Sequence, residues 1–472
     1  MLKIPDIIAK ACRAADAFQK LGQADTDAVV RSVYLSALAE RVSLAKLAHQ
    51  ETGMGIWQHK VIKNVIATQL VYEDIRHQKT VGLISEDPRS GISEVAQPLG
   101  PILGLIPVTN PTSTTIFKCL ISLKTRNALI VSPHQAARRS IGAAAEVCYR
   151  AALRAGAPES CIQWLDKVGP ESAADLMSHP SLALILATGT DSLVRRAHTS
   201  GTPVIGVGPG NVPVYIGVSA DLPFAVKSII SSKTFDHGSV CASEQAVVVR
   251  WEVADRVIEE FKWRGGYFLT PEETEKVGRI AYNAERGSMN AAIVGQSAQT
   301  VARQAGVEVP PETTLLLAPL RGVGRDYPLS AEILAPILAF YMEDDFDDAI
   351  RRCSEIMQFG GTGHTAVIYS NRDERIEYFS RVIKAGRILV NMPSTQGALG
   401  GIYNTLSPSF TLGCGTGGNN ITTDNITARH LLNIHRIARR RPNPRWLSLD
   451  PEILANEKVS PETIESAFHR NF

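Results

Sequence analysis

The hydrophobic pattern divides the chain into an N-terminal stretch and a long remainder of a different kind. From Ile7 to about Lys79, apolar residues recur at helical spacing, as at Leu35 and Leu38. This spacing predicts amphipathic helices. Gly53 and Gly55 interrupt the pattern and separate two of them. Beyond Lys79, short apolar runs take over, and we expect strands there.

Short apolar runs between residues 92 and 207 predict a first set of strands, with helices between them at 116–123 and 136–154. Strand, helix and strand in repeated order indicate a parallel sheet covered by helices on both faces. Ligands bind beyond the carboxyl ends of such strands. The predicted strands are Ile92–Gln97, Pro101–Pro107, Ala128–Val131, Cys161–Trp164, Leu182–Ala187 and Val204–Val207.

The same alternation begins again near Asp221 and runs to about Thr411, so we expect a second α/β unit. A Gly-, Asn- and Thr-rich stretch follows, and then an amphipathic segment at Ala428–Ala438. The strands predicted in the second unit are Ala246–Arg250, Ala291–Val294, Thr314–Ala318, Ile337–Tyr341, Ala366–Ser370 and Arg387–Val390. The chain is therefore predicted to be an α/β protein, with domains at 1–230 and 231–412 and a final segment at 413–472.

Composition excludes several classes of protein. Hydrophobic residues are 44% and charged residues 20% of the 472 positions, as in globular domains, and a net charge of +2 predicts no nucleic-acid partner. No apolar run reaches the roughly 18 residues of a membrane span, and the start lacks the apolar core of a signal peptide. Seven cysteines without zinc spacing predict a reducing compartment, the cytoplasm, and no metal.

The stretch Ser232–Gln245 is the strongest candidate for chemistry. It carries one cysteine, Cys241, and leads into the buried run Ala246–Val249. A rigid sheet often presents a nucleophile on such a loop, and nearby backbone N–H groups favour the reactive thiolate. For a cysteine taken alone, a role as a small hydrophobic residue is the more common one.

Two glycine-containing turns follow predicted strands. Thr188-Gly189-Thr190 reads as a strand, a turn and a helix start. A cofactor pyrophosphate is one reading, but this segment alone favours an ordinary turn between a strand and a helix. Gly206-Val207-Gly208-Pro209-Gly210-Asn211 is not a dinucleotide fingerprint, because Pro209 interrupts it. It still predicts a tight turn or a close approach of the backbone.

A histidine and a glutamate are further candidates. His364 lies in a Gly-rich stretch before a predicted strand, where it is compatible with a general base, a ligand contact or a bond to a carbonyl. Glu332 precedes an apolar strand and is compatible with holding a ribose or with a solvated surface position.

Taken in order, these signals resemble the CoA-acylating aldehyde dehydrogenases, and most closely the aldehyde dehydrogenase half of bifunctional aldehyde–alcohol dehydrogenases. The matching stretches cover nearly the whole chain, and those around the cysteine and the GVGPGN turn are specific to the acylating branch. They are Pro107–Ser113, Ile121–Asn127, Ile205–Asn211, Ser232–Gln245, Gly363–Thr365 and Thr411–Gly415.

The resemblance implies a fold and a set of roles. The fold would be a Rossmann-type cofactor domain at 1–230, a catalytic domain at 231–412, and a small oligomerisation sheet built from a strand near 90–98 and from the segment 413–472. Cys241 matches the catalytic thiol, Asn110 the oxyanion-hole amide, and His364 a candidate for thiol activation. The residues implied to bind NAD or NADP are Ser132, Pro133, His134, Thr188, Gly189, Thr190, Gly206, Gly208 and Glu332.

The implied reaction is reversible oxidation of a short-chain aldehyde, with NAD(P) and coenzyme A, to acyl-CoA through a cysteine thioester. Hydrolytic relatives carry a glutamate base in the segment that corresponds to Ile205–Asn211, which has no carboxylate here. A thiol needs less help than water as a nucleophile, so this difference favours CoA. Glu244 is close in sequence, and hydrolysis becomes possible if its side chain faces Cys241.

Other features leave alternatives open. The family's usual Asn is His237 here, which either suits an anionic aldehyde such as sulfoacetaldehyde or only shapes the loop. Acetaldehyde is the expected substrate and propionaldehyde is close to it. Arg138 and Arg139, with no acid before Glu146, permit NADP without requiring it. A reductase of acyl phosphates and a catalytically silent subunit are the remaining alternatives.

The resemblance also implies assembly and a limit on activity. A homodimer or homotetramer is expected, because the protruding sheet would present an edge that needs a partner strand. Bifunctional members continue into an iron-dependent alcohol dehydrogenase domain that these 472 residues do not contain. We therefore expect no alcohol as a product.

Overall fold

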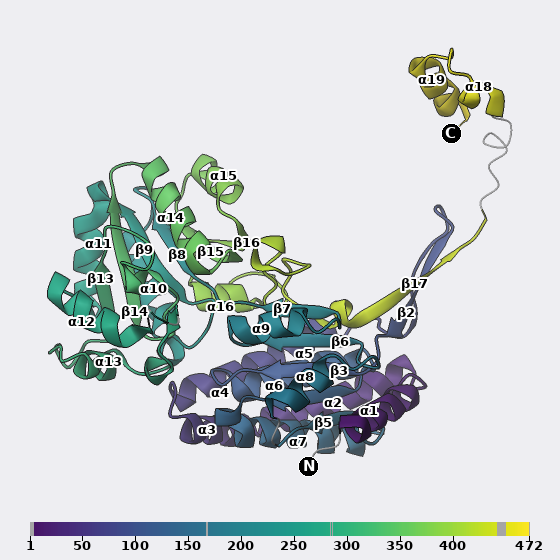
Figure 1. The fold of residues 1–472 in the computed structure, drawn as a ribbon, viewed down its shortest axis with the longest axis horizontal. Coiled ribbons are helices and arrows are strands. Elements are labelled where there is room, and N and C mark those ends of the chain that lie inside the picture. Colours follow the sequence, from purple (N-terminus) through teal and green to yellow (C-terminus); the bar gives the residue numbers. More distant parts are fainter. Residues whose placement is uncertain (1–3, 167–168, 284, 286, 441–449, 472) are drawn as a thin grey trace. The chain divides into compact units, whose positions relative to one another are not determined.

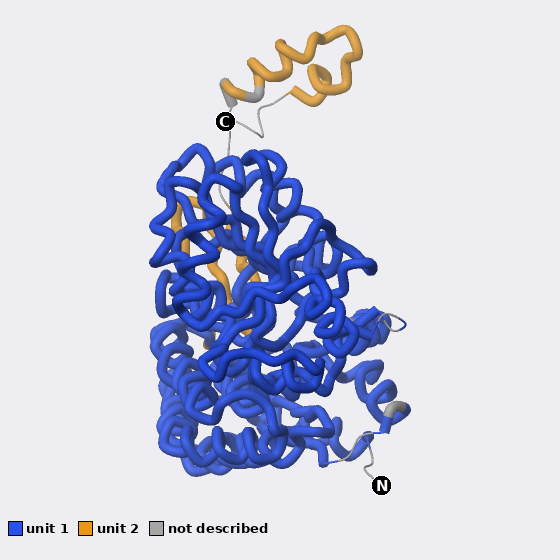
Figure 2. The backbone as a smooth tube through the Cα atoms, turned by 90° about the vertical axis from the view of Figure 1, so that its left-hand side faces the viewer, with its two compact units in different colours: residues 1–80, 98–432 blue, residues 81–97, 433–472 orange. Residues whose placement is uncertain are grey.

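The computed structural model describes residues 4–166, 169–283, 285, 287–440 and 450–471. These residues fall into two compact units (Figure 2). Unit 1 comprises Met1–Thr80 and Pro98–Leu432, and unit 2 comprises Val81–Gln97 and Asn433–Phe472. Within the described ranges no helix is both long enough and apolar enough to cross a membrane.

The N-terminal stretch is helical, as its apolar spacing predicts (Figure 1). Gly53 ends the third helix in the left-handed region, with φ 65°, which glycine adopts without strain. The helices are α1 (Ile4–Phe18), α2 (Gln23–Ala39), α3 (Arg41–Thr52), α4 (Trp57–Val65), the π-turn η1 (Ile66–Leu70) and α5 (Val71–Ile75).

In the described residues, the first large sheet of unit 1 has five parallel strands in the order β5-β4-β3-β6-β7. Alternate side chains of β6 enter two different cores: Leu184 and Leu186 pack toward α2, α6 and α7, and Ile185 packs toward α1, α8 and α9. The sheet is therefore covered on both faces. Its elements are β3 (Ile102–Ile106), α6 (Pro111–Lys124), β4 (Leu129–Pro133), η2 (Gln135–Ala137), α7 (Arg138–Arg154), β5 (Ile162–Trp164), α8 (Pro170–Met177), β6 (Leu184–Thr188), α9 (Asp191–His198) and β7 (Val204–Val207).

The second large sheet of unit 1 has seven described strands, all parallel, in the order β10-β13-β14-β9-β8-β15-β16. Its strands and helices are β8 (Val212–Ile216), α10 (Leu222–Lys233), η3 (Phe235–Gly238), β9 (Glu244–Arg250), α11 (Trp251–Trp263), β10 (Gly266–Phe268), α12 (Pro271–Ala281), α13 (Ala298–Gln304), β13 (Leu315–Pro319), η5 (Pro328–Ser330), β14 (Ile337–Glu343), α14 (Phe346–Gly360), β15 (Gly363–Tyr369), α15 (Asp373–Val382), β16 (Ala385–Val390) and α16 (Ser394–Leu399).

One expectation about the second half needs correction, and two predicted domain bounds can be compared with the sheets. Ala291–Val294 is not a strand: it begins with the 3₁₀ turn η4 (Ala291–Ile293), because the side chain of Asn290 accepts a hydrogen bond from Ala292 N–H. It lies near the small hairpin of β11 (Tyr282–Asn283) and β12 (Ser288–Met289) in the sequence. The seven-stranded sheet begins at β8, before the boundary expected at residue 230, and unit 1 continues to Leu432, past the boundary expected at 412.

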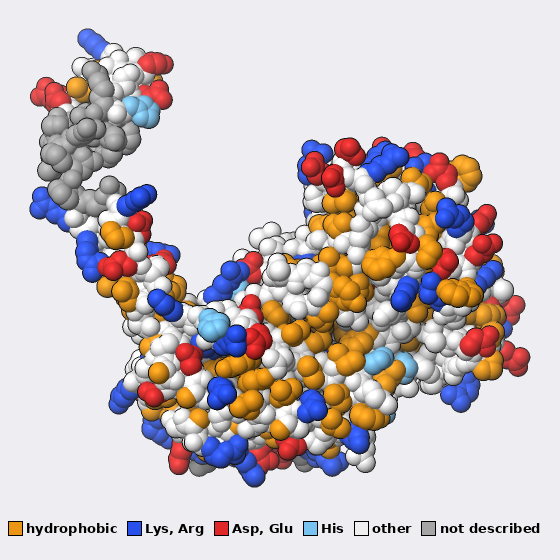
Figure 3. All heavy atoms as spheres, turned by 180° about the vertical axis from the view of Figure 1, so that it is seen from behind, with side chains coloured by type: hydrophobic (Ala, Val, Ile, Leu, Met, Phe, Trp, Pro, Cys, Tyr) orange, Lys and Arg blue, Asp and Glu red, His pale blue; other side chains and the backbone are white. Residues whose placement is uncertain are grey.

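Unit 2 is built on a three-stranded sheet. Its order is β1-β2-β17, formed by Gly82–Asp87, Ile92–Pro98 and Leu432–Ala438. The segment Ala428–Ala438 therefore becomes a 3₁₀ turn, η7 (Ala428–Leu431), and a strand. The remaining described elements are η6 (Thr416–Gly418), in unit 1, and α18 (Pro451–Ala455) and α19 (Pro461–Asn471), in unit 2. Charges of both signs are interspersed with hydrophobic side chains on the face in Figure 3.

Candidate active site

The loop that carries Cys241 has an unusual backbone. After α10, Asp236 and His237 have φ of 51° and 52°, and Gly238 has φ of 71°. Residues with a Cβ cost roughly 1–2 kcal/mol each in this left-handed region. The loop must therefore be held by contacts elsewhere, and Cys241 follows it directly, half-buried, ahead of β9.

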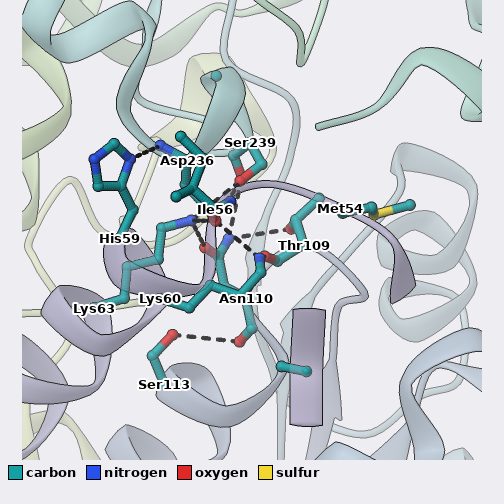
Figure 4. A network of polar contacts seen from close by, with 12 residues as sticks. Met54, Ile56, His59, Lys60, Lys63, Thr109, Asn110, Ser113, Asp236 and Ser239 are labelled. Carbon is teal, nitrogen blue, oxygen red and sulfur yellow. Dashed lines mark hydrogen bonds and ion pairs between the residues drawn. The ribbon is translucent and has the colours of Figure 1, made fainter. Parts of the chain in front are cut away.

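Those contacts converge on the buried carboxylate of Asp236 (Figure 4). One oxygen accepts from Ile56 N–H at 2.7 Å. The other accepts from Lys60 Nζ at 2.9 Å, from Ser239 Oγ at 2.8 Å and from Lys63 Nζ. Burial by itself raises the pKa of Asp236, but the charges of Lys63 and Lys60 outweigh it and hold the pKa well below its usual value.

Helix α4 supplies the partners of this carboxylate. Lys60 and Lys63 lie one turn apart on α4 and are 3% and 1% exposed. Burial lowers the pKa of Lys63 to about 8, although the charge of Asp236 opposes the shift. His59, on the same helix, accepts a hydrogen bond from Asp236 N–H through Nδ1 at 2.8 Å. The helix therefore fixes both the charge and the backbone of the nucleophile loop.

Asn110 reaches the same loop from the five-stranded sheet. It occupies the N-cap position of α6, just after β3. Its Nδ2 donates to Ser239 O at 3.4 Å and to Thr109 Oγ1 at 3.1 Å, and its Oδ1 accepts from Lys63 Nζ at 2.7 Å. The structure thus brings the predicted oxyanion donor beside the loop of the predicted nucleophile.

Glu332 and the GVGPGN turn also lie close to Cys241. Gly210 N–H donates to Glu332 Oε1 at 3.0 Å. A Cβ at Gly210 would lie 2.2 Å from the Cys241 carbonyl oxygen and 3.1 Å from His364 Cγ, so only glycine fits between these residues. This turn therefore approaches the backbone of Cys241, the predicted nucleophile.

Burial shifts the pKa of both the Cys241 thiol and the Glu332 carboxyl, and Glu332 also influences the thiol. Burial raises the pKa of Cys241 to about 12, and the negative charge of Glu332 adds to the shift. Burial also raises the pKa of Glu332, to about 7. In the absence of ligands, then, the environment opposes formation of the thiolate.

His364 is placed differently from the expectation. It is the second residue of β15, not part of a loop before a strand, and it is fully buried. Nδ1 lies 2.9 Å from Thr365 Oγ1, and Nε2 has no hydrogen-bond partner among the described residues. Burial, aided by the charge of Arg387, lowers the pKa of His364 to about 3. A neutral imidazole of this kind is a weak proton acceptor.

Eight of the nine residues expected to bind the cofactor lie at the ends of strands of the five-stranded sheet; the ninth, Glu332, precedes β14 of the other sheet. Ser132 and Pro133 end β4 and are followed by His134; Thr188 ends β6 and is followed by Gly189 and Thr190; Gly206 lies in β7, and Gly208 follows that strand. Carboxyl ends of parallel strands meet at a common edge. The sequence thus identified a set of positions that the fold brings together.

The reasons for the three glycines differ. A Cβ at Gly189 would lie 2.9 Å from Leu193, and one at Gly206 would lie 2.7 Å from Val194. Packing of α9 therefore explains both glycines. Gly208 is half-buried, and a Cβ there would meet nothing within 4 Å. Thr190 makes no capping bond to the start of α9, so the first turn of that helix keeps donors for a phosphate. These features fit a dinucleotide.

Two uncertain residues now have defined surroundings. Glu244 is fully buried, and its Oε1 accepts from Ser394 N–H at 2.8 Å, at the start of α16. Burial raises the pKa of Glu244 to about 7. Burial lowers the pKa of His237, and the charged groups that influence it are Asp236, His59, His49 and Lys60.

Several contributors were missed by sequence reasoning. Lys60, Lys63 and His59 lie more than 170 residues from the loop that they hold. The two lysines one helical turn apart are the feature of the sequence that could have pointed to a shared acidic partner. Glu51 was missed as well: it accepts from Arg139 N–H and Ser140 N–H at 2.8 and 2.7 Å. An acid therefore lies at the start of α7, where the sequence had indicated only arginines.

Comparison with known proteins identifies the group to which this site belongs. The model of the aldehyde dehydrogenase family matches residues 3–404. The chain belongs to the aldehyde dehydrogenase family. A crystal structure of an acetylating aldehyde dehydrogenase from Geobacillus thermoglucosidasius is 43% identical, with a TM-score of 0.90, and the match covers 93% of this chain and 97% of that chain. The expected family and fold are confirmed.

Two curated family members add detail. The bifunctional aldehyde-alcohol dehydrogenase of Escherichia coli K12 is 43% identical over 451 residues, which is 95% of this chain and 50% of the relative. The chain thus spans about half the length of the aldehyde-alcohol dehydrogenases that it matches. The acylating sulfoacetaldehyde dehydrogenase of Bilophila wadsworthia is 37% identical over 398 residues, covering 83% of this chain and 84% of that protein.

Proposed function

We propose that the chain is a CoA-acylating aldehyde dehydrogenase that uses NAD(P) and works through a thioester on Cys241. One observation carries the proposal. Two groups that support such chemistry reach the segment of Cys241: the Asn110 amide donates to Ser239 O, and Gly210, which donates to Glu332, packs against the Cys241 carbonyl. In this family member, the groups come from both large sheets of unit 1.

In the proposed reaction, the Cys241 thiolate adds to the aldehyde carbon and the carbonyl oxygen becomes an oxyanion. Asn110 Nδ2 and the backbone N–H of Cys241 donate to this oxygen. NAD(P)⁺, when bound, supplies a nicotinamide that accepts hydride from the former carbonyl carbon, leaving a thioester on Cys241. The CoA thiol attacks the thioester carbon, the bond to Cys241 breaks and acyl-CoA leaves.

Two observations support CoA over water as the acyl acceptor. The turn Ile205–Asn211 has no carboxylate, so it offers no general base for water. Glu244, the nearest carboxyl in the sequence, accepts from Ser394 N–H, an interaction that orients its bonded oxygen toward the start of α16. A hydrolytic reaction would need a general base beside the thioester; the turn has none, and no hydrogen bond among the described residues joins Glu244 to Cys241. His364 is retained as a candidate contact to the attacking group, through its unpartnered Nε2.

We propose acetaldehyde as the substrate, since the structural relative with 43% identity is named acetylating. Propionaldehyde and sulfoacetaldehyde are the alternatives, the second because an acylating relative is named for it. The lowered pKa of His237 favours its neutral form, which is a weaker partner for a sulfonate than a cation would be. His237 is therefore proposed to shape the loop.

We also propose that the residues at the edge of β4, β6 and β7 bind the dinucleotide, with Glu332 on the nicotinamide ribose. For assembly we propose a homodimer or homotetramer formed through the sheet of unit 2, where Leu83, Ile92 and Ile437 are 51%, 37% and 47% exposed. The seven unpaired cysteines are consistent with the cytoplasm as its location.

The test is reduced-cofactor formation from acetaldehyde, propionaldehyde and sulfoacetaldehyde, with NAD⁺ or NADP⁺, with and without CoA. We expect CoA-dependent turnover that is fastest with acetaldehyde and absent in Cys241→Ala, with acyl-CoA identified by mass spectrometry. Turnover without CoA that yields the free acid would contradict the proposal and favour a hydrolytic enzyme.

A further inference from the structure

The orientation of the Asn110 amide has a specific cause. An amide side chain offers an acceptor on one side and donors on the other, and the two orientations differ only by a flip. Lys63 Nζ lies 2.7 Å from Asn110 Oδ1. An ammonium group only donates, so it can face Oδ1 and cannot face Nδ2. With Oδ1 bound in this way, Nδ2 is left facing Ser239 and the loop of Cys241.

Lys63 is itself fixed by a complete set of partners. Its three protons match three acceptors: Asn110 Oδ1, Asp236 Oδ2 and Ser239 Oγ, the last at 3.1 Å. Figure 4 shows the lysine between Asn110 and the nucleophile loop. The side chain is 1% exposed, so water does not replace any of these partners. One ammonium therefore joins α4, the cap of α6 and the loop before Cys241.

We propose that Lys63, held by Asp236, is a positioning residue that orients the Asn110 amide toward the oxyanion. The inference rests on the role proposed above for Asn110. Lys60 supports it from the same helix: its Nζ bonds Asp236 and lies 3.4 Å from the carbonyl oxygen of Thr109, the residue before Asn110. Without Lys63, the amide is free to flip and to present an oxygen where a donor is needed.

The test measures acylation of Cys241 by p-nitrophenyl acetate, which needs neither an aldehyde nor CoA nor a dinucleotide. The thiolate sulfur bonds the acetyl carbon, the ester bond breaks and p-nitrophenolate leaves, so the step passes through the same type of oxyanion. The burst of p-nitrophenolate gives the rate, and intact-protein mass with Cys241→Ala identifies the site. Wild type, Lys63→Met, Asn110→Ala and the double variant form a cycle.

Loss of an oxyanion donor lowers the acylation rate by about 10²–10³-fold, which is expected for Asn110→Ala. Misplacement of that donor in Lys63→Met is expected to cost up to about 10²-fold. If Lys63 acts through Asn110, the double variant is no slower than Asn110→Ala alone. A merely structural loss would instead multiply the two effects, and that result would overturn the inference, as would a wild-type rate in Lys63→Met.

Lys124→Met is the matched control. Lys124 is a lysine with a 0% exposed side chain, paired with Asp27 and bonded to Arg76 O at 3.2 Å, at the opposite end of α6 from Asn110. The Lys124→Met variant should be less stable than the wild type and keep the wild-type acylation rate. If wild type is acylated at Cys241 but forms no reduced cofactor with any aldehyde and CoA, the proposed function fails and the positioning role stands. If Cys241 is not acylated in wild type, the inference itself is rejected.

Discussion

At the scale of single residues, the site combines the proposed nucleophile, Cys241, with a neighbour that opposes its ionisation. Glu332 contributes to the raised pKa of Cys241, and its own pKa is raised to about 7 by burial. The carboxyl therefore carries its full charge only above neutral pH. Any ligand that neutralises or engages Glu332 makes the thiolate easier to form.

Glu332→Gln should therefore make Cys241 more reactive in the absence of ligands. Removal of the negative charge lowers the pKa of the thiol, and we expect alkylation by iodoacetamide at pH 8 to be on the order of 3- to 10-fold faster. The ratio to wild type should approach one below pH about 7, where burial keeps Glu332 protonated in the wild type. Glu244→Gln is the control, because Glu244 is bound to Ser394. An unchanged rate in Glu332→Gln would contradict the prediction.

Asp236 should stabilise the fold in a pH-dependent way. Its pKa is lowered in the folded protein, so its contribution is present above the unfolded pKa of about 4 and is lost as pH falls below that value. At pH 7, Asp236→Asn leaves two buried lysines without their carboxylate, and we expect a loss of roughly 3–5 kcal/mol in the free energy of unfolding. Urea unfolding checks this at pH 7 and pH 3.5, where the difference should be smaller. An equal loss at both pH values would contradict this account.

Sequence reasoning was uneven at this scale. Cys241 and Asn110 could be predicted as site residues because local motifs and a family resemblance point to them, and the structure places Asn110 beside the loop that leads to Cys241. Lys63 was not, because its function depends on a contact with Asp236 across 173 residues. A lysine within an amphipathic helix reads as solvent-exposed until the tertiary structure supplies a buried acid.

At the scale of elements, the turn between α3 and α4 is shaped to receive the nucleophile loop. Gly55 has φ of 68°, and a Cβ there would lie 2.0 Å from Asp236 Oδ1. Gly53 has nearly the same φ, 65°, but a Cβ there would meet nothing within 4 Å. Gly53 is thus required only by its backbone conformation, whereas Gly55 is required both by its conformation and by its close contact with Asp236.

Gly55→Ala should consequently be worse than Gly53→Ala. Both substitutions carry the cost of a left-handed residue, about 1–2 kcal/mol. Only Gly55→Ala also displaces the Asp236 carboxylate, so it should slow acylation of Cys241 by p-nitrophenyl acetate while Gly53→Ala does not. Thermal unfolding and the burst rate measure the two effects separately. Equal burst rates in the two variants would show that the carboxylate tolerates the methyl group.

Prediction of elements succeeded where apolar runs are long and uninterrupted, as in β6. β8 was missed because Pro213 lies within it, although that strand is fully buried. β1 was missed because its exposed residues are mostly polar. The strand predicted at Ala291–Val294 was wrong because a short apolar run also suits a capped 3₁₀ turn. β17 was not predicted as a strand because it carries exposed charged residues. Its partner strand β2 also lies more than 300 residues earlier in the sequence.

At the scale of the whole molecule, unit 2 offers a direct test of assembly. Ile437 lies on β17, an outer strand of the three-stranded sheet, and is 47% exposed. If copies of the chain associate through this sheet, Ile437→Asp should convert the oligomer to a smaller species in size-exclusion chromatography with light scattering. Leu454→Asp is the control, because Leu454 is 46% exposed on α18 and outside the sheet. A dissociation caused equally by both variants would contradict an interface at the sheet.

One ammonium group joins α4, the cap of α6 and the loop before Cys241. This arrangement has a consequence for the order of events in folding. Residues 60–63 precede both large sheets, Asn110 follows the first strand of the five-stranded sheet, and residues 236–239 lead into β9 of the seven-stranded sheet. The site therefore forms only when parts of both sheets have met. A nascent or partly unfolded chain has the cysteine but neither its oriented amide nor its fixed loop. The oriented amide and the fixed loop are therefore acquired late in folding. The proposed reaction at Cys241 accordingly requires the folded chain.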